Sequence, residues 1–366
     1  MQVDDLPAKP IAPAGKIEIE VQGPDDFRTQ ALGTCRVPEY SFDRSQFQIS
    51  PSTRWLSALY EGLGHQPYLL RARCGGVLAG ALPLAFVRST LFGRFLVSLP
   101  YVNSAGVSGS SEQVVTALIS SAVGLADKLN VRYLELRQER EVAHSALTQR
   151  NDTKILMRLS LKGTSAELWD SFKSKLRSQI RTGEKNEFDV RFGGIELLAD
   201  FYRVFSQNMR DLGTPVYSRG LFASILRAFG DEAELCVLRL KGAPVAAALL
   251  VHGLGTTEVP SASSLRAFNA TSANMVMYWH LLRRATERGQ KQFDFGRSTI
   301  DSNTYKFKAQ WGAKPHPSVW QYYVRRGSIG EMRPGNAKFG MAIKVWQRLP
   351  VWLTRLVGPA IVRGIP

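Results

Sequence analysis

The sequence LKGAPVAAAL at residues 240–249 repeats the pattern of RCGGVLAGAL at residues 73–82, in the first half of the chain. Each stretch predicts the end of one strand, a tight turn that contains glycine, and a second strand of small and apolar residues. Each predicted hairpin is followed by further strands and by a helix that leads into another strand. The repeat therefore indicates two similar domains, each built from strands and helices.

The length of the chain supports this division. With 366 residues, it is long enough for about two domains. The polar segment KGTS at residues 162–165 precedes a helical pattern that carries Trp169, and we place the domain boundary there. The predicted organisation is a flexible leader at residues 1–15, a first domain at 16–162, a second domain at 163–326 and an amphipathic tail at 327–366.

The pattern of apolar residues predicts an α/β (α+β) fold, because strands alternate with amphipathic helices along the chain. In the first half we expect one helix at residues 112–129 and strands at residues 17–21, 68–73, 77–87, 94–99, 132–137 and 155–161. In the second half we expect helices at residues 166–181, 196–212 and 275–288, and strands at residues 235–240, 245–251, 258–264, 292–295 and 319–324. Gly289 follows the last of these helices, at the position where a left-handed residue often ends a helix.

The composition limits the classes of partner. The net charge of +16 predicts attraction to nucleic acid, to phosphorylated or nucleotide-linked substrates, or to the acidic inner face of a membrane. No apolar run is long enough to span a bilayer, and the N-terminus has acids and prolines where a signal peptide needs a basic start. The three cysteines are far apart, which favours the cytoplasm and predicts no metal site.

The segment KQFDFGRSTIDSNTYKFKAQWG at residues 291–312 is the strongest candidate for a site. It predicts a strand with Phe293 and Phe295 on one face and Asp294 on the other. A turn at residues 296–298 then leads into a cationic segment that carries Arg297, Tyr305, Lys306 and Lys308. A carboxylate and several cations in one loop region suit chemistry on an anionic substrate. The alternative is a buried strand followed by a solvated basic loop.

Two further groups of polar residues are candidates for substrate binding. One is a row of cations at intervals of four on the helix predicted at 166–181, namely Lys173, Arg177, Arg181 and Lys185. The other lies at the end of the next helix and combines an amide, a guanidinium, a carboxylate and a phenol, namely Asn208, Arg210, Asp211 and Tyr217. The first group suits a phosphate or polyanion and the second suits a sugar or peptide. A solvated helix face and ordinary helix caps are the alternatives. No metal-binding, nucleophile-elbow or nucleotide-loop motif is present.

The C-terminal tail is basic and amphipathic. Its apolar face contains Trp346, Leu349, Leu353, Leu356 and Ile361, and its cations are Lys344, Arg348, Arg355 and Arg363. Such a tail either lies on an anionic membrane surface or packs back onto the body of the protein.

FDFGRS at residues 293–298, followed by YKFKAQWGAKP at residues 305–315, resembles the closing motif of FemAB-like proteins. These belong to the GNAT-fold group of peptidyl and acyl transferases. The resemblance extends to NMRDLGTPVYS at residues 208–218, and it covers most of residues 40–325 and the tail segment WQRLPVWLTRLVGP. The chain is most similar to FemAB-related proteins associated with exopolysaccharide and exosortase (PEP-CTERM) gene clusters.

The resemblance implies two tandem GNAT-like domains, each with a mixed, mostly antiparallel sheet flanked by helices. It implies an acyl- or aminoacyl-transferase that acts on an amine or hydroxyl of a cell-envelope or exopolysaccharide precursor, with a phosphate-bearing substrate in the inter-domain cleft. The family's phosphate-contacting lysine corresponds to Lys308. The donor is acyl-CoA or aminoacyl-tRNA. The loop at residues 266–274 lacks the glycines of the usual coenzyme A loop, and no long heptad arm for tRNA is present.

The resulting hypothesis gives Lys308, with Arg297 and Lys306, the task of neutralising phosphates or a developing oxyanion. Asp294 or Asp211 accepts the proton of the nucleophile, or a substrate phosphate does so instead. The residues expected to bind substrate are Lys306, Tyr305, Asn208, Arg210, Asp211, Tyr217, Arg177 and Arg181. In the alternative hypothesis, the chain is a catalytically inactive, basic component of a polysaccharide assembly apparatus at the membrane surface. General nucleic-acid binding is a third hypothesis.

Overall fold

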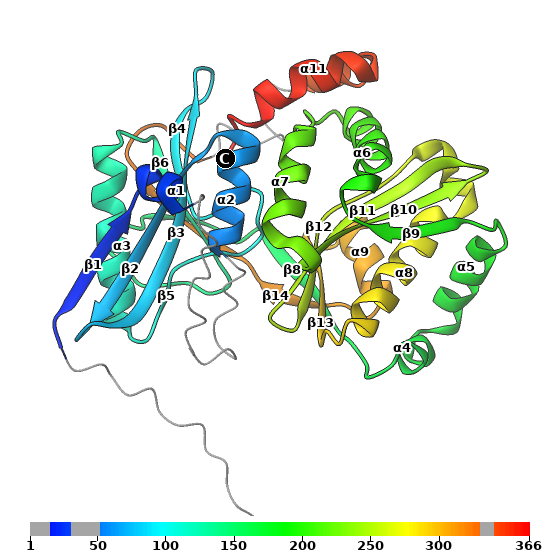
Figure 1. The fold of residues 1–366 in the computed structure, drawn as a ribbon, viewed down its shortest axis with the longest axis horizontal. Coiled ribbons are helices and arrows are strands. Elements are labelled where there is room, and N and C mark those ends of the chain that lie inside the picture. The colour runs from blue at the N-terminus through cyan, green and yellow to red at the C-terminus, as the bar shows by residue number, and fades with distance from the viewer. Residues whose placement is uncertain (1–14, 31–51, 330–339) are drawn as a thin grey trace, which may run out of the picture.

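The computed structural model describes residues 15–30, 52–329 and 340–366, which form two sheets flanked by helices (Figure 1). The predicted mixed α/β class is therefore confirmed. The predicted leader, apart from its last residue, and residues 330–339 of the predicted tail lie outside the described residues.

The first sheet is mostly antiparallel, with one parallel pair, β4 and β6, near its centre. Its strand order is β1 (Ile17–Gln22), β2 (Gln66–Cys74), β3 (Val77–Ser89), β4 (Gly93–Val97), β6 (Tyr133–Gln138), β15 (Val319–Val324) and β7 (Gln149–Asn151), and β5 (Ser108–Gly109) pairs with β3. Helix α3 (Glu112–Lys128) buries Val114, Leu118 and Ile119 against one face of this sheet. Two further helices in this half are α1 (Pro24–Gln30) and α2 (Ser52–Leu63).

The second sheet has the same pattern, with a single parallel pair, β12 and β13. Its strand order is β9 (Asp189–Gly193), β10 (Ala233–Leu240), β11 (Ala243–Gly253), β12 (Thr256–Ser264), β13 (Gln292–Thr299), β8 (Lys154–Ser160) and β14 (Lys314–Pro317). One face packs against α4 (Ser165–Ser171), α5 (Ser174–Glu184), α8 (Ala273–Glu287) and α9 (Asn303–Gln310). The other face packs against α6 (Leu198–Leu212) and α7 (Arg219–Phe229).

The two sheets exchange one strand each. The predicted boundary near residue 162 assigns β8 to the first half and β15 to the second half. Instead, β8 pairs with β13 in the second sheet and β15 pairs with β6 in the first. Apolar alternation identifies a strand but leaves its partner open, so the exchange was not predictable from these segments alone. It ties the two halves together through their sheets.

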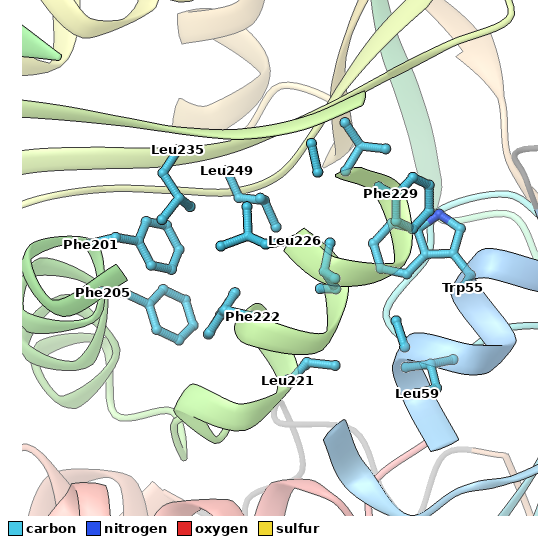
Figure 2. Packing of buried hydrophobic residues seen from close by; sticks show 14 of the residues in the cluster. Trp55, Leu59, Phe201, Phe205, Leu221, Phe222, Leu226, Phe229, Leu235 and Leu249 are labelled. Carbon is cyan, nitrogen blue, oxygen red and sulfur yellow. The ribbon is translucent and has the colours of Figure 1, made fainter. Parts of the chain in front are cut away.

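Helices α2 and α7 were not predicted, and they pack against each other between the two sheets. The rings of Trp55 and Phe229 lie 5.1 Å apart, edge to face. Leu59 of α2 and Leu221 of α7 belong to the same buried cluster (Figure 2). A side chain at Gly62 would place its Cβ 2.6 Å from the Cα of Leu221, so glycine there permits the close approach of the two helices.

The single helix predicted at residues 166–181 is two helices. Thr164 begins α4 with a capping box, in which its hydroxyl accepts from the Glu167 N–H at 3.2 Å. Phe172 is then extended, and α5 begins after Lys173. The predicted row of four cations is therefore broken, because Lys173 precedes the helix that carries Arg177 and Arg181.

The tail forms α10 (Gly340–Trp346) and α11 (Val351–Val362), and one side of it packs on the body. Arg355 Nε donates a hydrogen bond to the buried Ser206 Oγ at 2.8 Å. A Cβ at Gly358 would lie 2.8 Å from the backbone nitrogen of Val216. Among the helices of the described residues, none combines the length and the apolar composition that a bilayer span requires.

Candidate functional site

Three charged residues form a row across adjacent strands of the second sheet. Asp294 on β13 is the register partner of Arg158 on β8 and of Glu258 on β12. Phe293 and Phe295 enter the cluster of apolar side chains on the opposite face, as predicted from their alternation with Asp294. The row therefore lies on the face away from α8 and α9.

Arg158, at the β8 end of this row, is paired with two carboxylates. Its Nε donates to Asp294 Oδ2 at 2.8 Å, and its two terminal nitrogens donate to Glu139 at 2.6 and 2.5 Å. Burial alone would lower the pKa of Arg158, but the bonds and charges of Glu139 and Asp294 outweigh it and raise the pKa. Arg158 thus joins the second sheet to Glu139, which follows the last residue of β6.

Glu258 has a different environment from that of Asp294. Burial, and secondarily the charge of Asp294 beside it, raises the pKa of Glu258 to about 8. Within the described part of the chain, its carboxyl makes no ion pair, in contrast to the Asp294–Arg158 pair. A carboxyl with a pKa near neutral pH suits general acid–base catalysis.

A β-bulge places Arg297 on the same face as Asp294. In the strand register, Asp294 lies opposite Arg158 and Arg297 lies opposite Leu156. An advance of three residues along β13 therefore corresponds to two residues along β8. Gly296 at the bulge has φ +74°, and its N–H donates to Asp294 Oδ1 at 2.6 Å. The turn predicted at residues 296–298 is therefore a bulge inside a longer strand.

Lys308 supports this bulge from α9. Its Nζ donates to the carbonyl oxygens of Gly296 and Arg297, at 3.0 and 2.9 Å. Burial lowers the pKa of Lys308 to about 8. Asp294, Arg297 and Lys308 thus converge on Gly296, and two of the three hydrogens of the Lys308 ammonium are directed at the backbone.

Arg297 lacks the counter-charge that Arg158 has. Its guanidinium carbon lies 3.6 Å from the centre of the Trp320 ring, and that of Arg137 lies 4.1 Å from the same ring. Its Nε is buried without a hydrogen-bond partner. Burial, together with the charge of Arg137, lowers the pKa of Arg297 to about 10. An anion beside Arg297 would relieve both costs.

Tyr217 lies close to this pair of arginines. Burial raises the pKa of Tyr217 to about 12, and the charges of Arg137 and Arg297 act against this rise. Its ring is 4.8 Å from that of Tyr101, whose hydroxyl donates to the carbonyl oxygens of Val362 and Ile365 in the tail. Tyr217, one of the residues predicted at the end of α6, is therefore near Arg297.

The remaining predicted residues have other contacts. Asn208 Nδ2 donates to Ser263 Oγ at 3.1 Å, and Arg210 pairs with Asp211 at 2.7 Å and donates to the Leu349 carbonyl. These contacts join α6 to β12 and to the tail.

The predicted site residues on α9 and α5, other than Lys308, are exposed or make contacts of their own. On α9, Lys306 is exposed and Tyr305 packs against the apolar cluster. On α5, Arg177 pairs with Asp170 at 3.5 Å, and Arg181 lies over the Trp169 ring at 5.5 Å.

Several residues of the site were missed in the sequence. Arg158 lies inside the apolar strand ILMRLS, and Arg137 lies inside YLELRQ. Glu258 begins the segment EVPSASS, which we predicted only as a strand. A charged residue in a buried strand needs a partner or a function. That signal was available, but it does not identify which partners meet.

The loop before α8 turns without glycine. Residues Arg266–Thr271 form a 3₁₀ turn, and Ser272 takes the left-handed conformation with φ +56° before α8 begins. The chain therefore makes a tight turn into α8 although the loop lacks the glycines of the usual coenzyme A loop. The position is suited to an anionic group, since the first turn of a helix has free N–H groups.

The comparisons with known proteins agree with this architecture. Residues 170–308 match the family described as an acetyltransferase (GNAT) domain. The chain is similar to a solved structure reported as the crystal structure of FemX, with a TM-score of 0.57 and 16% identity, over 75% of this chain and 91% of that one.

Two other solved structures resemble the chain at a lower level. The structure of L-PGS from Bacillus licheniformis has a TM-score of 0.49 and 14% identity, over 76% of this chain and 86% of that one. A tandem GNAT protein from the clavulanic acid biosynthesis pathway has a TM-score of 0.46 and 13% identity, over 86% of this chain and all (100%) of that one. No curated protein sequence matches the chain. The predicted fold of two GNAT-like domains is confirmed by the repeated sheet order and the domain match.

Proposed function

We propose that this protein is an acyl- or aminoacyl-transferase whose acceptor is an amine or hydroxyl of an anionic cell-envelope or exopolysaccharide precursor. The reaction takes place where β12 and β13 part, beside Glu258, and Arg297 holds the anionic part of the acceptor. The protein acts on the cytoplasmic side of the membrane and resembles the FemAB-related group in this respect.

One observation carries the proposal. Adjacent strands place on one sheet face a carboxyl, Glu258, and a guanidinium, Arg297, that make no ion pair within the described residues. A folded protein normally pairs such groups, because burying an unpaired charge is costly. A proton acceptor and an anion-binding group on one sheet face are what transfer to an anionic acceptor requires.

The chemistry follows from these two groups. The carboxylate of Glu258 accepts the proton of the acceptor amine or hydroxyl as its nitrogen or oxygen attacks the acyl carbon. The bond between that carbon and the donor's sulfur or oxygen then breaks, and the leaving group takes the proton from Glu258 and departs as a thiol or an alcohol, which restores the carboxylate. Asp294 and Arg158 hold the strand ends, and Lys308 holds the bulge that directs Arg297 toward the acceptor.

The position of the donor site is inferred from the place where β12 and β13 separate. The parallel pairing of β12 with β13 ends at Glu258 and Asp294, and β13 then bulges toward β8. Strands that part in this way leave backbone groups with which an extended, amide-bearing donor arm can pair. The arm of acyl-CoA fits this description, with its pyrophosphate near Ser272 at the start of α8. Aminoacyl-tRNA is the alternative donor.

A transfer assay tests the proposal. The full-length protein is incubated with an acyl-CoA, or with charged tRNA, and with nucleotide-linked or lipid-linked saccharide precursors, and mass spectrometry measures the mass added to the acceptor. We expect turnover with one donor class. Glu258→Gln should lower that turnover by at least about a hundredfold, because the amide cannot accept the proton.

Glu287→Gln is the matched control. Glu287 pairs with Arg283 on the surface of α8, and its loss should leave turnover unchanged. A folded Glu258→Gln variant with the turnover of the wild type would refute the role of Glu258. A wild-type protein that transfers neither donor to any precursor would refute the transferase itself.

A further inference from the structure

The outer side of the C-terminal tail exposes large apolar side chains. Met341 in α10 is 79% exposed, and Trp352 and Leu356 in α11 are 66% and 71% exposed. Residues four apart share one side of a helix, so Trp352 and Leu356 lie on the same side of α11. Thr354, Gly358 and Val362 are buried against the body. The side of α11 that faces away from the protein is therefore apolar.

The tail is also uniformly basic. From residue 332 to the C-terminus, the sequence contains no aspartate or glutamate. The cations of residues 340–366, which comprise the two tail helices and the residues beside them, are Lys344, Arg348, Arg355 and Arg363, and all of them except Arg355 are exposed. The tail therefore combines exposed apolar groups with cations and has no acid. This combination is complementary to a layer with an apolar interior and anionic groups at its surface.

A second element extends this surface. The β3–β4 hairpin has Leu91 at its tip, 74% exposed, and Arg88 and Arg94 lie opposite each other close to this tip. A Cβ at Gly364 would touch the side chains of Ser89 and Phe92, so the end of the tail contacts the hairpin. Figure 1 shows the hairpin projecting from the same edge of the molecule along which α11 lies.

We infer that the outer faces of α10 and α11 and the tip of the β3–β4 hairpin form one docking surface for a membrane with anionic lipid headgroups. Trp352, Leu356 and Leu91 enter the boundary between headgroups and acyl chains, and Lys344, Arg348, Arg88 and Arg94 contact the headgroups. This inference does not depend on the transferase proposal.

A lipid surface fits these features better than a second copy of the chain does. Two copies that met through this surface would bring their cations together without any acid to pair them, and like charges repel. A projecting leucine flanked by arginines is also suited to a fluid surface, into which it can insert without a preformed pocket.

Vesicle sedimentation with the full-length protein tests the inference. We expect binding to vesicles of phosphatidylcholine that contain about one third phosphatidylglycerol, little binding to phosphatidylcholine alone, and release at about 0.5 M salt. The double substitution Trp352→Ser with Leu356→Ser should lower the partition coefficient by at least about tenfold. Leu91→Ser should lower it by about threefold, because one side chain is lost from a separate element.

Leu254→Ser is the matched control, since Leu254 is an exposed leucine in the β11–β12 turn, outside this surface. It should bind as the wild type does, and circular dichroism should show every variant folded. Equal binding to neutral and anionic vesicles, or unchanged binding of the double variant, would overturn the inference. So would a dimer in sedimentation velocity that the double substitution dissociates, since the surface would then belong to a second copy. Transfer activity is measured separately, and its absence leaves these outcomes unchanged.

Discussion

The two sheets have the same strand order but differ at one equivalent row. In the first sheet, the parallel pair β4–β6 ends at Val97 and Glu135, and Glu135 lies opposite Tyr322 of β15. In the second sheet, the parallel pair β12–β13 ends at Glu258 and Asp294, and Asp294 lies opposite Arg158 of β8. Both central strands therefore carry a buried acid at the same place.

The residues on both sides of this acid differ: Tyr322 corresponds to Arg158, and Val97 corresponds to Glu258. Val97 is fully buried and apolar, whereas its counterpart Glu258 is a half-buried carboxyl with a raised pKa. The acid of the first sheet, Glu135, is paired with Arg137 at 2.6 Å. The duplicated fold thus uses a central acid for structure in both halves, and the second half alone adds a carboxyl free for chemistry in this row.

The largest expected effect concerns two arginines of the second sheet. Arg158 is paired with the central acid Asp294, whereas Arg297 makes no ion pair within the described residues. Arg158→Met should lower the free energy of unfolding by about 3–5 kcal/mol, because Asp294 would remain buried without its cation. Arg297→Met should change it little, because Arg297 makes no ion pair within the described residues and burial already opposes its charge. Denaturant unfolding, followed by circular dichroism, measures both values. Similar values for the two variants would contradict the distinction.

The second effect sharpens the role of Arg297. Arg297→Met should raise the KM for the anionic acceptor by about tenfold to a hundredfold, since a charged hydrogen bond contributes about 1.5–3 kcal/mol. The kcat should change much less, because the substitution leaves Glu258 in place. Steady-state kinetics separates the two constants. An unchanged KM would show that the acceptor's anion binds elsewhere.

The third effect is a pH dependence that Glu258, the counterpart of the apolar Val97, gives to the second sheet. Glu258 accepts a proton only when it is ionised, and its pKa is about 8. Turnover should therefore rise about tenfold per pH unit below pH 8 and level off above it. Lys308 also titrates near pH 8, but its neutral amine keeps two hydrogens for the carbonyl oxygens of Gly296 and Arg297. A flat pH–rate profile between about pH 6 and 9 would contradict the assignment of Glu258 as the base.

The smallest effect tests the contact between the halves at the bulge. Gly296 and Gly289 have nearly the same positive φ, +74° and +73°, but a Cβ at Gly296 would lie 3.1 Å from Asn103 Nδ2, whereas Gly289 faces open space. Gly289→Ala should cost about 1 kcal/mol for its backbone conformation alone. Gly296→Ala should cost about 1 kcal/mol more, and thermal unfolding measures the difference. Equal costs would mean that the Asn103 side chain simply moves away.

The sequence alone determined where most strands and the long helices lie, that the fold is mixed α/β, and that Phe293 and Phe295 face away from Asp294. These properties depend on the local period of apolar residues, which survives without knowledge of any partner. The convergence of Asp294, Arg297 and Lys308 was also within reach, because the three residues lie within one short segment.

Only the tertiary structure decided which strands exchange between the sheets, that Arg158 meets Asp294 and Glu139, and that Glu258 lies in the same row without an ion pair among the described residues. It also showed that Arg210 and Asp211 hold the tail and that the segment after Phe295 is a bulge. Pairing across a sheet joins residues far apart in the chain, and the pKa of a carboxyl depends on burial and on neighbours that only the folded chain brings near. Residue order therefore determined the elements, whereas packing between distant segments decided which charges are satisfied and which are left for chemistry.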